Sequence, residues 1–402
     1  MERLGSGGFG VVYRAEDFYG TGRQYAVKCL RRTPDTAEHQ RQCRECWAHG
    51  EVSDHPNVIT FHDTAVDEQY FFMIFDYCPG GDLYGMIAKS RMFYRKDDLI
   101  KRVFVQLLDA VQHCVDNGVF HRDLKPENVL CSLDGSQIYL TDFGLAAKAN
   151  YTSRHGIGSR STMSPEALGE EVYLTSYSVT NSDVWSLGII LCNMVSGHCP
   201  WHEATTRDKR FREFLSNPYD LRRNIPISRE LCALLMRVFT FNPFARISLQ
   251  TFREEVGKID RFFMSEEDMA YSPDRIRELA SGYAKRGPTP LPSGMSSWGD
   301  DEFDLAEGSR VVLVRRRYRA APASPEFEGA AENPVAPAIS AVGDVVLTDP
   351  WLAYMREHEA PESDVEIIDL TAPGLCPRPV EPPVLRVKTP ILCPLWLDGQ
   401  GA

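Results

Sequence analysis

The sequence predicts an α+β fold with two lobes, a small β-rich N-terminal lobe over residues 1–77 and a larger helical lobe over residues 78–264, followed by a mostly disordered tail. Two patterns predict the lobes: strand-like runs fill the first third of the chain, and apolar residues at helical spacing dominate the part that follows. A change of composition after residue 264 predicts the tail.

The composition of the 402-residue chain is that of a folded protein without a membrane span. It has 43% hydrophobic and 25% charged residues, and it contains no uninterrupted apolar run of about 18 residues. The first residues lack the basic and apolar segments of a secretory signal, and the eleven cysteines are scattered. We therefore expect reduced thiols and a cytoplasmic or nuclear location. A net charge of −12 argues against general nucleic-acid binding, and we expect no membrane partner.

Acidic residues and prolines concentrate in residues 265–402. This segment has 13 Lys and Arg against 23 Asp and Glu, a net charge of −10 out of −12 for the whole chain, and 17 of the 26 prolines. Such a composition buries too little apolar surface to offset the entropy lost on folding. We therefore expect a folded body over residues 1–264 and a largely disordered tail after it.

The strand-like runs of the small lobe are separated by turn residues and by one polar helical stretch. Gly20 and Gly22 mark the first turn, and His55-Pro56-Asn57 ends the helix. The expected elements are, in chain order, strands over 11–15 and 24–30, a helix over 36–51, and strands over 58–61 and 71–77.

The larger lobe is expected to be helical. Apolar side chains recur at spacings of three and four from Leu99 to Val111, which places them on one face of a helix. Three further helices are expected over 182–195, 228–239 and 248–259, and no internal repeat is evident.

Glycines recur near the N-terminus at Gly5, Gly7 and Gly10, in the pattern G-x-G-x-x-G-x-V. Without a Cβ atom, glycine lets the backbone approach a phosphate closely. The pattern alone is also compatible with a glycine-rich hairpin turn. A strand follows the glycines here, whereas a helix follows a dinucleotide-binding loop, so the dinucleotide interpretation is disfavoured.

Lys28 ends the run Tyr-Ala-Val-Lys in the second expected strand and would place an ammonium group beside a groove, where it could bind nucleotide phosphates. On its own, a strand lysine is more often a solvated edge residue. Glu45 in the following helix could hold Lys28 in an ion pair, and Glu38 and Glu51 are rivals on the same helix. We favour Glu45 because of its distance along the chain from His55-Pro56-Asn57.

Two motifs lie further along the chain, His121-Arg122-Asp123-Leu124-Lys125-Pro126-Glu127-Asn128 and Asp142-Phe143-Gly144. Together with the glycine pattern and Lys28, and in this order, they resemble the signature of the eukaryotic protein kinases. The resemblance covers residues 4–263, and a lysine two residues after Asp123 is similar to the Ser/Thr-specific branch. It implies a bilobal protein-kinase-like fold and transfer of the γ-phosphate of ATP to Ser or Thr hydroxyls of protein substrates.

The resemblance implies a role for each motif residue. Asp123 would accept or orient the proton of the substrate hydroxyl, and Lys125 would stabilise the transferring phosphate. Asn128 and Asp142 would bind the Mg²⁺ that bridges the ATP phosphates. Phosphoryl transfer needs positioning and charge neutralisation more than covalent chemistry. The expected catalytic set is Asp123, Lys28, Glu45, Lys125, Asn128 and Asp142, with Asn128 and Asp142 as the metal ligands.

The resemblance implies the ATP site in the same way. Apolar side chains from both lobes would sandwich the adenine, Phe75 would guard the pocket behind it, and Asp82 would contact the ribose. Backbone groups of Asp76 and Cys78 would bond to the edge of the adenine. The expected ATP-binding residues are Leu4, Gly5, Ser6, Gly7, Gly8, Phe9, Gly10, Val12, Ala26, Lys28, Phe75, Asp76, Cys78, Asp82 and Leu130.

Other parts of the resemblance are architectural or regulatory. Glu166, in Ser164-Pro165-Glu166, is the expected partner of Arg246, and residues 183–188 match a buried central helix. Arg122 could bind a phosphorylated or acidic activation segment, although an ordered segment that needs no phosphate is the alternative. The candidate phosphate acceptors are Thr152, Ser153 and, less favoured, Tyr151.

The chain departs from the family pattern in ways that bear on specificity and stability. Ser159 and Thr162 replace the commonest residues near the catalytic base, which leaves the peptide preference open. Glu127 and Asp82 could favour basic residues N-terminal to the acceptor hydroxyl. The first strand of the family normally begins well before the glycines, so we expect a weakly anchored sheet edge or a misplaced start codon.

The tail contains two candidate interaction motifs. Residues 364–371 combine an apolar, β-prone core with acidic flanks and look like a SUMO-interaction motif, which adds a strand to a sheet edge of SUMO or a SUMO-modified partner. An apolar patch in a disordered chain is the alternative. Residues 315–319 are basic and could serve in nuclear import, although a solvated charge run is commoner. Cys43 and Cys46 lack a second ligand pair, so no zinc site is expected.

Among protein kinases, the run of residues that includes 76–83 and 163–166 is most similar to nutrient-responsive fungal kinases. Two other functions are alternatives: a kinase-like scaffold without catalysis, and a small-molecule kinase of the same fold. The expected catalytic residues argue against the scaffold. Ser164-Pro165-Glu166 and the helices after it resemble the peptide-docking part of protein kinases and argue against a small-molecule substrate.

Overall fold

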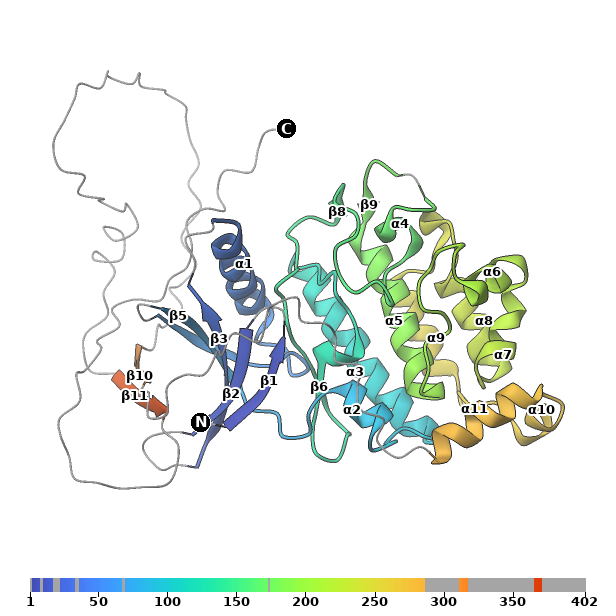
Figure 1. Ribbon diagram of the computed structural model, residues 1–402, viewed down its shortest axis with the longest axis horizontal. Helices are drawn as coiled ribbons and strands as arrows, with labels where there is room; N and C mark the ends of the chain where they lie inside the picture. The colour runs from blue at the N-terminus through green and yellow to red at the C-terminus, as the bar shows by residue number, and fades with distance from the viewer. Residues whose placement is uncertain are drawn as a thin grey trace, which may run out of the picture.

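The structure is a computed structural model that describes residues 2–7, 10–16, 22–32, 36–66, 69–172, 174–285, 311–316 and 365–370. A small lobe built on a β-sheet and one helix lies beside a larger, mainly helical lobe (Figure 1). The expected α+β, two-lobed architecture is therefore confirmed.

The small lobe is a five-stranded antiparallel sheet in the order β1-β2-β3-β5-β4. Successive side chains of a strand point to opposite faces, and in β3 Val27 is buried with one apolar cluster while Ala26 packs against another on the opposite face. Lys28 shares the face of Ala26. The strands are β1 (Glu2–Gly7), β2 (Gly10–Glu16), β3 (Gln24–Arg31), β4 (Phe61–Val66) and β5 (Tyr70–Asp76).

The helix of the small lobe, α1 (Thr36–Val52), confirms the helix expected over 36–51. The strand expected over 58–61 is wrong, because β4 begins only at Phe61. Residues before it pair instead with the large lobe: Ile59 N donates to Leu140 O at 3.0 Å, and Leu140 N donates to Asn57 O at 2.8 Å. This segment therefore connects the sheet of the small lobe to a strand that leads into the catalytic region.

The large lobe is organised around helix α5 (Val179–Ser196), which is buried over almost its whole length. The helix expected at 182–195 is thereby confirmed as the central one. Ser178 caps its N-terminus and Gly197, at φ 70°, ends it. The other helices are α2 (Leu83–Ala88), α3 (Asp97–Asp116), α4 (Pro165–Leu168), α6 (Lys209–Ser216), α7 (Leu221–Asn224), α8 (Arg229–Val238) and α9 (Leu249–Lys258).

Four short strands and three single-turn helices complete the lobe. The strands form two pairs, one leading to the catalytic residues and one joining residues 151–152 to the start of α5. They are β6 (Val129–Cys131), β7 (Ile138–Leu140), β8 (Tyr151–Thr152) and β9 (Tyr177–Ser178), and the short helices are η1 (Pro126–Asn128), η2 (Pro218–Asp220) and η3 (Pro243–Ala245).

The folded body extends past the boundary expected at residue 264, which corrects the expected start of the tail. Helices α10 (Glu266–Ala270) and α11 (Asp274–Lys285) follow it and lie along the end of the large lobe (Figure 1). Ile276 is fully buried, and the hydroxyl of Tyr283 donates to Met194 O at 3.3 Å. The sequence of this stretch is highly charged, but its charged residues lie on one face of α11 and the two apolar anchors, Ile276 and Tyr283, lie on the other.

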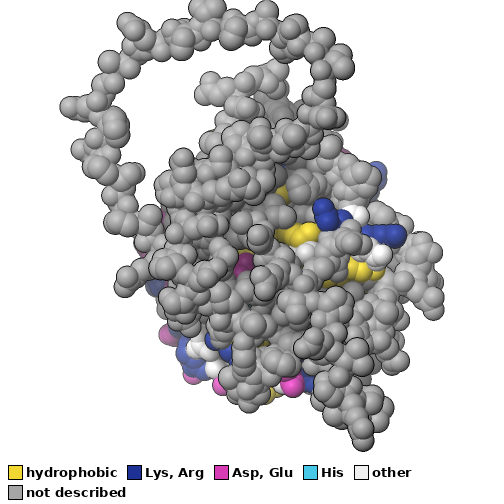
Figure 2. Space-filling model, turned by 90° about the vertical axis from the view of Figure 1, so that its left-hand side faces the viewer, with side chains coloured by type: hydrophobic (Ala, Val, Ile, Leu, Met, Phe, Trp, Pro, Cys, Tyr) yellow, Lys and Arg dark blue, Asp and Glu magenta, His cyan; other side chains and the backbone are white. Residues whose placement is uncertain are grey.

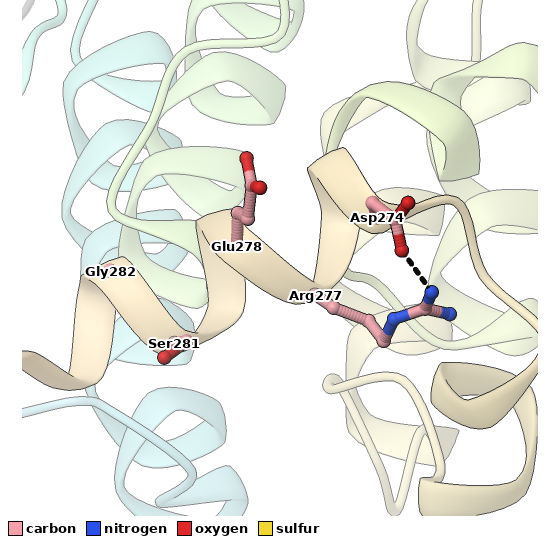
Figure 3. A pocket seen from close by; sticks show the side chains of 5 residues that line it. All are labelled: Asp274, Arg277, Glu278, Ser281 and Gly282. Carbon is pink, nitrogen blue, oxygen red and sulfur yellow. Dashed lines mark hydrogen bonds and ion pairs between the residues drawn. The ribbon is translucent and has the colours of Figure 1, made fainter.

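Removing the inner anchor of α11 is expected to destabilise the protein. Ile276→Ala should lower the free energy of unfolding by about 2–4 kcal/mol, because it opens a cavity under α11. Glu278 is a matched control: it lies on the outer face of α11 with Asp274 and Arg277, beside a shallow hollow (Figure 3). Glu278→Ala should change stability by less than about 0.5 kcal/mol. Urea unfolding of the full chain measures both, and equal effects would contradict the docking of α11.

Two strands beyond residue 285 are described, β10 (Val311–Arg316) and β11 (Val365–Leu370), and they pair antiparallel with Arg315 opposite Glu366. The other residues of the expected tail lie outside the described part. Within that part, no helix is both long and apolar enough to cross a bilayer. Figure 2 shows one side of the molecule, on which Lys and Arg side chains lie beside hydrophobic ones.

Candidate active site

The catalytic loop surrounds Asp123 with hydrogen-bond donors. One carboxylate oxygen accepts from Ser159 N at 2.8 Å. The other accepts from Lys125 Nζ at 2.8 Å and from Asn128 Nδ2 at 3.2 Å. Asp123 is only 4% exposed, so its orientation is fixed by these donors and not by water. The structure thus brings together the expected base, the expected phosphate-binding lysine and Ser159.

Two buried contacts hold the catalytic loop in place. His121 Nε2 lies 3.0 Å from Thr141 O, and Arg122 N donates to Asp183 Oδ1 at 3.3 Å. Arg122 has φ 68°, in the left-handed region that non-glycine residues rarely adopt, so the loop is held against a local conformational cost. Burial raises the pKa of Asp183 to about 7, although the backbone N–H groups that it accepts from oppose that rise.

Lys28 joins the two lobes through two carboxylates. Its Nζ lies 2.5 Å from Glu45 Oε1 and 3.2 Å from Asp142 Oδ1. Burial opposes the charge of Lys28, but Asp142 and Glu45 outweigh burial and raise the pKa of the ammonium group. Burial likewise opposes the charge of Asp142, and Lys28 outweighs it and lowers the pKa of Asp142. The ion pair selects Glu45 over Glu51, whose side chain is exposed.

Asn128 and Asp142 supply the oxygen atoms that a magnesium site needs. The amide nitrogen of Asn128 donates to Asp123 O at 2.8 Å, so its amide oxygen is left for another partner. Asp142 adopts φ 64° and turns its carboxylate toward Lys28. Mg²⁺ is usually held by one or two such protein ligands together with substrate phosphates, which this pair fits. The described residues include no cluster of three or more His, Cys, Asp or Glu suited to a metal, and the side chains of Cys43 and Cys46 are buried.

Several residues expected around the adenine come from different lobes and pack against the same apolar cluster. Ala26, Cys78 and Leu130 pack against one buried apolar cluster that includes Phe75. Val12 lies opposite Lys28 in the pairing of β2 with β3. The Cys78 thiol donates to Cys131 O at 2.8 Å, which ties the connection between the lobes to β6.

For the other expected ATP-binding residues, the structure gives the position of the backbone or a single contact. Leu4 is 43% exposed on β1, and Asp82 caps α2 by accepting from Gly85 N at 2.7 Å. Gly10 has φ 134°, and a Cβ there would lie 2.4 Å from Cys29 O, so the strand tolerates only glycine at this turn. Gly5 and the backbone of Ser6 and Gly7 lie in β1, and the backbone of Asp76 ends β5. Gly8 and Phe9 lie outside the described residues.

Arginines gather beside the activation segment. Arg122 Nη2 donates to Arg154 O at 3.3 Å. Burial lowers the pKa of Arg44, and the charges of Arg154, Arg122 and Arg41 lower it further. A phosphate group in this region would meet arginine side chains, which bind phosphate through charge-assisted hydrogen bonds. The candidate acceptor Thr152 is close, since its Oγ1 accepts from Arg154 N at 3.1 Å.

The expected pair of Glu166 and Arg246 is present and fully buried. Arg246 Nη1 lies 2.5 Å from Glu166 Oε1, and Nη2 lies 3.0 Å from Oε2. The guanidinium also covers the ring of Trp185 at 5.0 Å. This bidentate pair fixes α4, and with it the segment that contains Ser159, to the end of the domain.

Sequence reasoning missed two residues of the site. Asp183 was expected only as part of a buried helix, yet it holds the catalytic loop through Arg122 N. His49, one turn after Glu45 on α1, was not singled out. It is fully buried and its ring packs against Phe143. Its spacing of four from Glu45 was the available signal, because residues four apart share a helix face.

The fold and this constellation of residues define a phosphotransferase site of the protein kinase type, and a family model described as "Protein kinase domain" matches residues 1–256. The chain therefore belongs to the protein kinase family.

Curated relatives place it within that family. It is 40% identical over 266 residues to "Negative regulator of sexual conjugation and meiosis" of Schizosaccharomyces pombe, covering 61% of this chain and 56% of the relative. It is 32% identical over 277 residues to "Serine/threonine-protein kinase ksp1" of the same yeast, covering 66% and 57%. "CBL-interacting protein kinase 1" of Oryza sativa subsp. japonica is 34% identical over 256 residues, covering 62% and 53%.

The chain thus spans between half and three-fifths of the length of these relatives. Yeast proteins named as Ser/Thr kinases stand among them, which confirms the expected resemblance to fungal Ser/Thr protein kinases. A response to nutrients stays a prediction.

Proposed function

We propose that the protein is an active Ser/Thr protein kinase that transfers the γ-phosphate of Mg-ATP to protein hydroxyls. The observation that carries the proposal is the joining of Lys28, Glu45 and Asp142 in one ion-pair network. Asp123, with its donors from Lys125 and Asn128, supplies the base. A substrate hydroxyl placed at Asp123 would lie beside Lys125, whose ammonium group would neutralise charge on the transferring phosphoryl group.

The same observation disfavours a silent scaffold. A scaffold needs no buried lysine held between two carboxylates, because the arrangement costs desolvation of three charges. Here Lys28 and Glu45 have side-chain exposures of only 13% and 4%. Such a cost is characteristic of a site where strain and charge serve catalysis.

We further propose a preference for basic residues N-terminal to the acceptor hydroxyl. Glu127 is exposed next to the catalytic loop, where Lys125 attracts its charge and Asp82 and Asp123 repel it. A substrate Arg or Lys near Glu127 and Asp82 would add a positive charge beside two carboxylates. Phosphate on Thr152 or Ser153 would add negative charge beside Arg122 and Arg154, which supports control by phosphorylation.

The tail proposals depend on its two described strands. We propose that residues 364–371, which contain β11, bind SUMO or a SUMO-modified partner by strand addition, because β11 already pairs as an antiparallel strand with β10. A cytoplasmic or nuclear location is proposed with it, where such partners and reduced thiols occur together.

A degenerate Ser/Thr peptide array tests the proposed activity. With Mg-ATP labelled at the γ-phosphate, the full chain should label peptides with Arg or Lys before the acceptor, and Asp142→Asn should label none. Lys28 remains in that variant, so its ammonium group still binds phosphate while the metal carboxylate is lost. No transfer by the wild type, even after treatment with an upstream kinase, would favour the scaffold. Transfer without a basic preference would reject the proposed role of Glu127.

A further inference from the structure

His49 is a buried polar residue that the expected catalytic set does not use. It lies on α1 one turn after Glu45, and it is fully buried. A position on the inner face of a helix is ordinarily apolar, because a buried polar side chain costs free energy unless it is hydrogen-bonded. The reason for a histidine here lies in its contacts.

The imidazole of His49 bonds to the backbone segment that connects the lobes. Its Nε2 lies 2.8 Å from Ile59 O. Since a carbonyl oxygen only accepts, Nε2 carries the proton and donates. Ile59 N in turn donates to Leu140 O at 3.0 Å, and Leu140 ends β7 two residues before Asp142. The imidazole of His49 and the backbone of one residue, Ile59, therefore link α1, which carries Glu45, to the strand that leads to Asp142.

The ring of His49 also packs against aromatic side chains of the site. Its centroid lies 4.8 Å from that of Phe143, in an edge-on arrangement, and 4.9 Å from that of Phe75. Phe143 follows Asp142 directly, and it packs in turn on His121 of the catalytic loop at 4.9 Å. Packing alone could be supplied by leucine or methionine, so the aromatic contacts do not explain the choice of histidine.

The second ring nitrogen shows what the histidine costs. Nδ1 is buried and has no hydrogen-bond partner among the described residues. A buried acceptor without a partner is unfavourable, and an apolar side chain would avoid that cost. The donor Nε2 is thus the one feature of His49 that an apolar side chain of the same size lacks.

We propose that His49 is a positioning residue of the kinase: its hydrogen bond to Ile59 O holds α1 where Glu45 reaches Lys28 and holds the preceding backbone where Asp142 reaches the same lysine. The predicted effect on kinetics rests on the proposed function, whereas the predicted effect on the position of α1 does not. It predicts that a side chain with a donor at the place of Nε2 will substitute for histidine, and that an apolar one will not.

Two substitutions in the full chain separate these possibilities. His49→Leu keeps the volume and removes the donor, whereas His49→Gln places an amide donor near the position of Nε2. His49→Leu should raise the KM for ATP and lower kcat/KM roughly five- to tenfold, the effect of losing one net hydrogen bond, and His49→Gln should stay within about threefold of wild type. His113→Leu on α3 makes the same chemical change away from Lys28 and should leave both constants unchanged.

Hydrogen exchange of the α1 amides gives a readout that needs no catalysis. These amides should exchange faster in His49→Leu than in His49→Gln, because α1 opens more often without its bond to Ile59. If His49 served only in packing, both substitutions would lower the melting temperature and the fraction of protein that is active, and the KM for ATP would be unchanged. Equal KM values and equal α1 exchange in the two variants would overturn the proposal. If the wild type transfers no phosphate, the proposed function fails, and the exchange comparison still decides the role of His49.

Discussion

Replacement of Asp123 by asparagine is expected to lower kcat by a factor of about 10² to 10⁴, the range that a general base contributes. Asparagine has the same shape and still accepts the bond from Ser159 N, which Asp123 now accepts at 2.8 Å. Its amide nitrogen, however, cannot accept from Lys125 Nζ, which lies 2.8 Å from the carboxylate. The variant thus loses both the proton acceptor and the anchor of the phosphate-binding lysine.

Steady-state kinetics on a peptide from the array measure this loss, with nucleotide affinity as the internal control. Lys28, Glu45 and Asp142 are untouched by the substitution, so the KM for ATP should stay within about threefold of wild type. Thermal unfolding should show the same melting temperature to within a few degrees. A kcat within tenfold of wild type would show that Asp123 is not the base, and a parallel loss of ATP affinity would point to a disturbed site.

The fold was predictable wherever periodicity and burial agree. The central helix α5 and the strands β2 and β3 follow their apolar patterns closely. Residues 58–60 misled the prediction because Val58 N donates to His55 O and Ile59 N donates to Leu140 O in the large lobe, a distant partner that no local pattern reveals. Helix α11 was missed because its overall charge resembles that of the tail, while its buried apolar side chains among the described residues are Ile276 and Tyr283.

The site was predictable where chemistry demands a particular residue type. Asp123, Asn128, Asp142 and Lys28 belong to motifs, and the structure brings them together. Glu45 was favoured among three glutamates of one helix by its position along the chain, and its ion pair with Lys28 agrees with that choice. The spacing of four from Glu45 places His49 on the same helix face, but its hydrogen bond could not be predicted, because the partner is the backbone of Ile59 and a backbone partner leaves no trace in side-chain patterns.

Replacement of Glu166 by glutamine is expected to lower the free energy of unfolding by about 3–5 kcal/mol, because it leaves the guanidinium of Arg246 buried without its counter-charge. Both side chains of the pair are 0% exposed. The remaining partners of Arg246 are backbone carbonyls, Asn181 O at 2.7 Å and Thr240 O at 3.1 Å, which accept hydrogen bonds but carry no net charge. Urea unfolding of the full chain measures the change.

An exposed pair provides the matched control for Glu166. Arg95 bonds to Glu266 with side-chain exposures of 45% and 77%, so Glu266→Gln should cost no more than about 1 kcal/mol. The difference between the two glutamate-to-glutamine changes isolates burial, since the chemistry is identical. Adding Arg246→Met to Glu166→Gln should recover part of the loss, because it removes the uncompensated charge. If Glu166→Gln costs no more than Glu266→Gln, water must reach Arg246, and the segment that contains Ser159 must be held to the domain by other contacts.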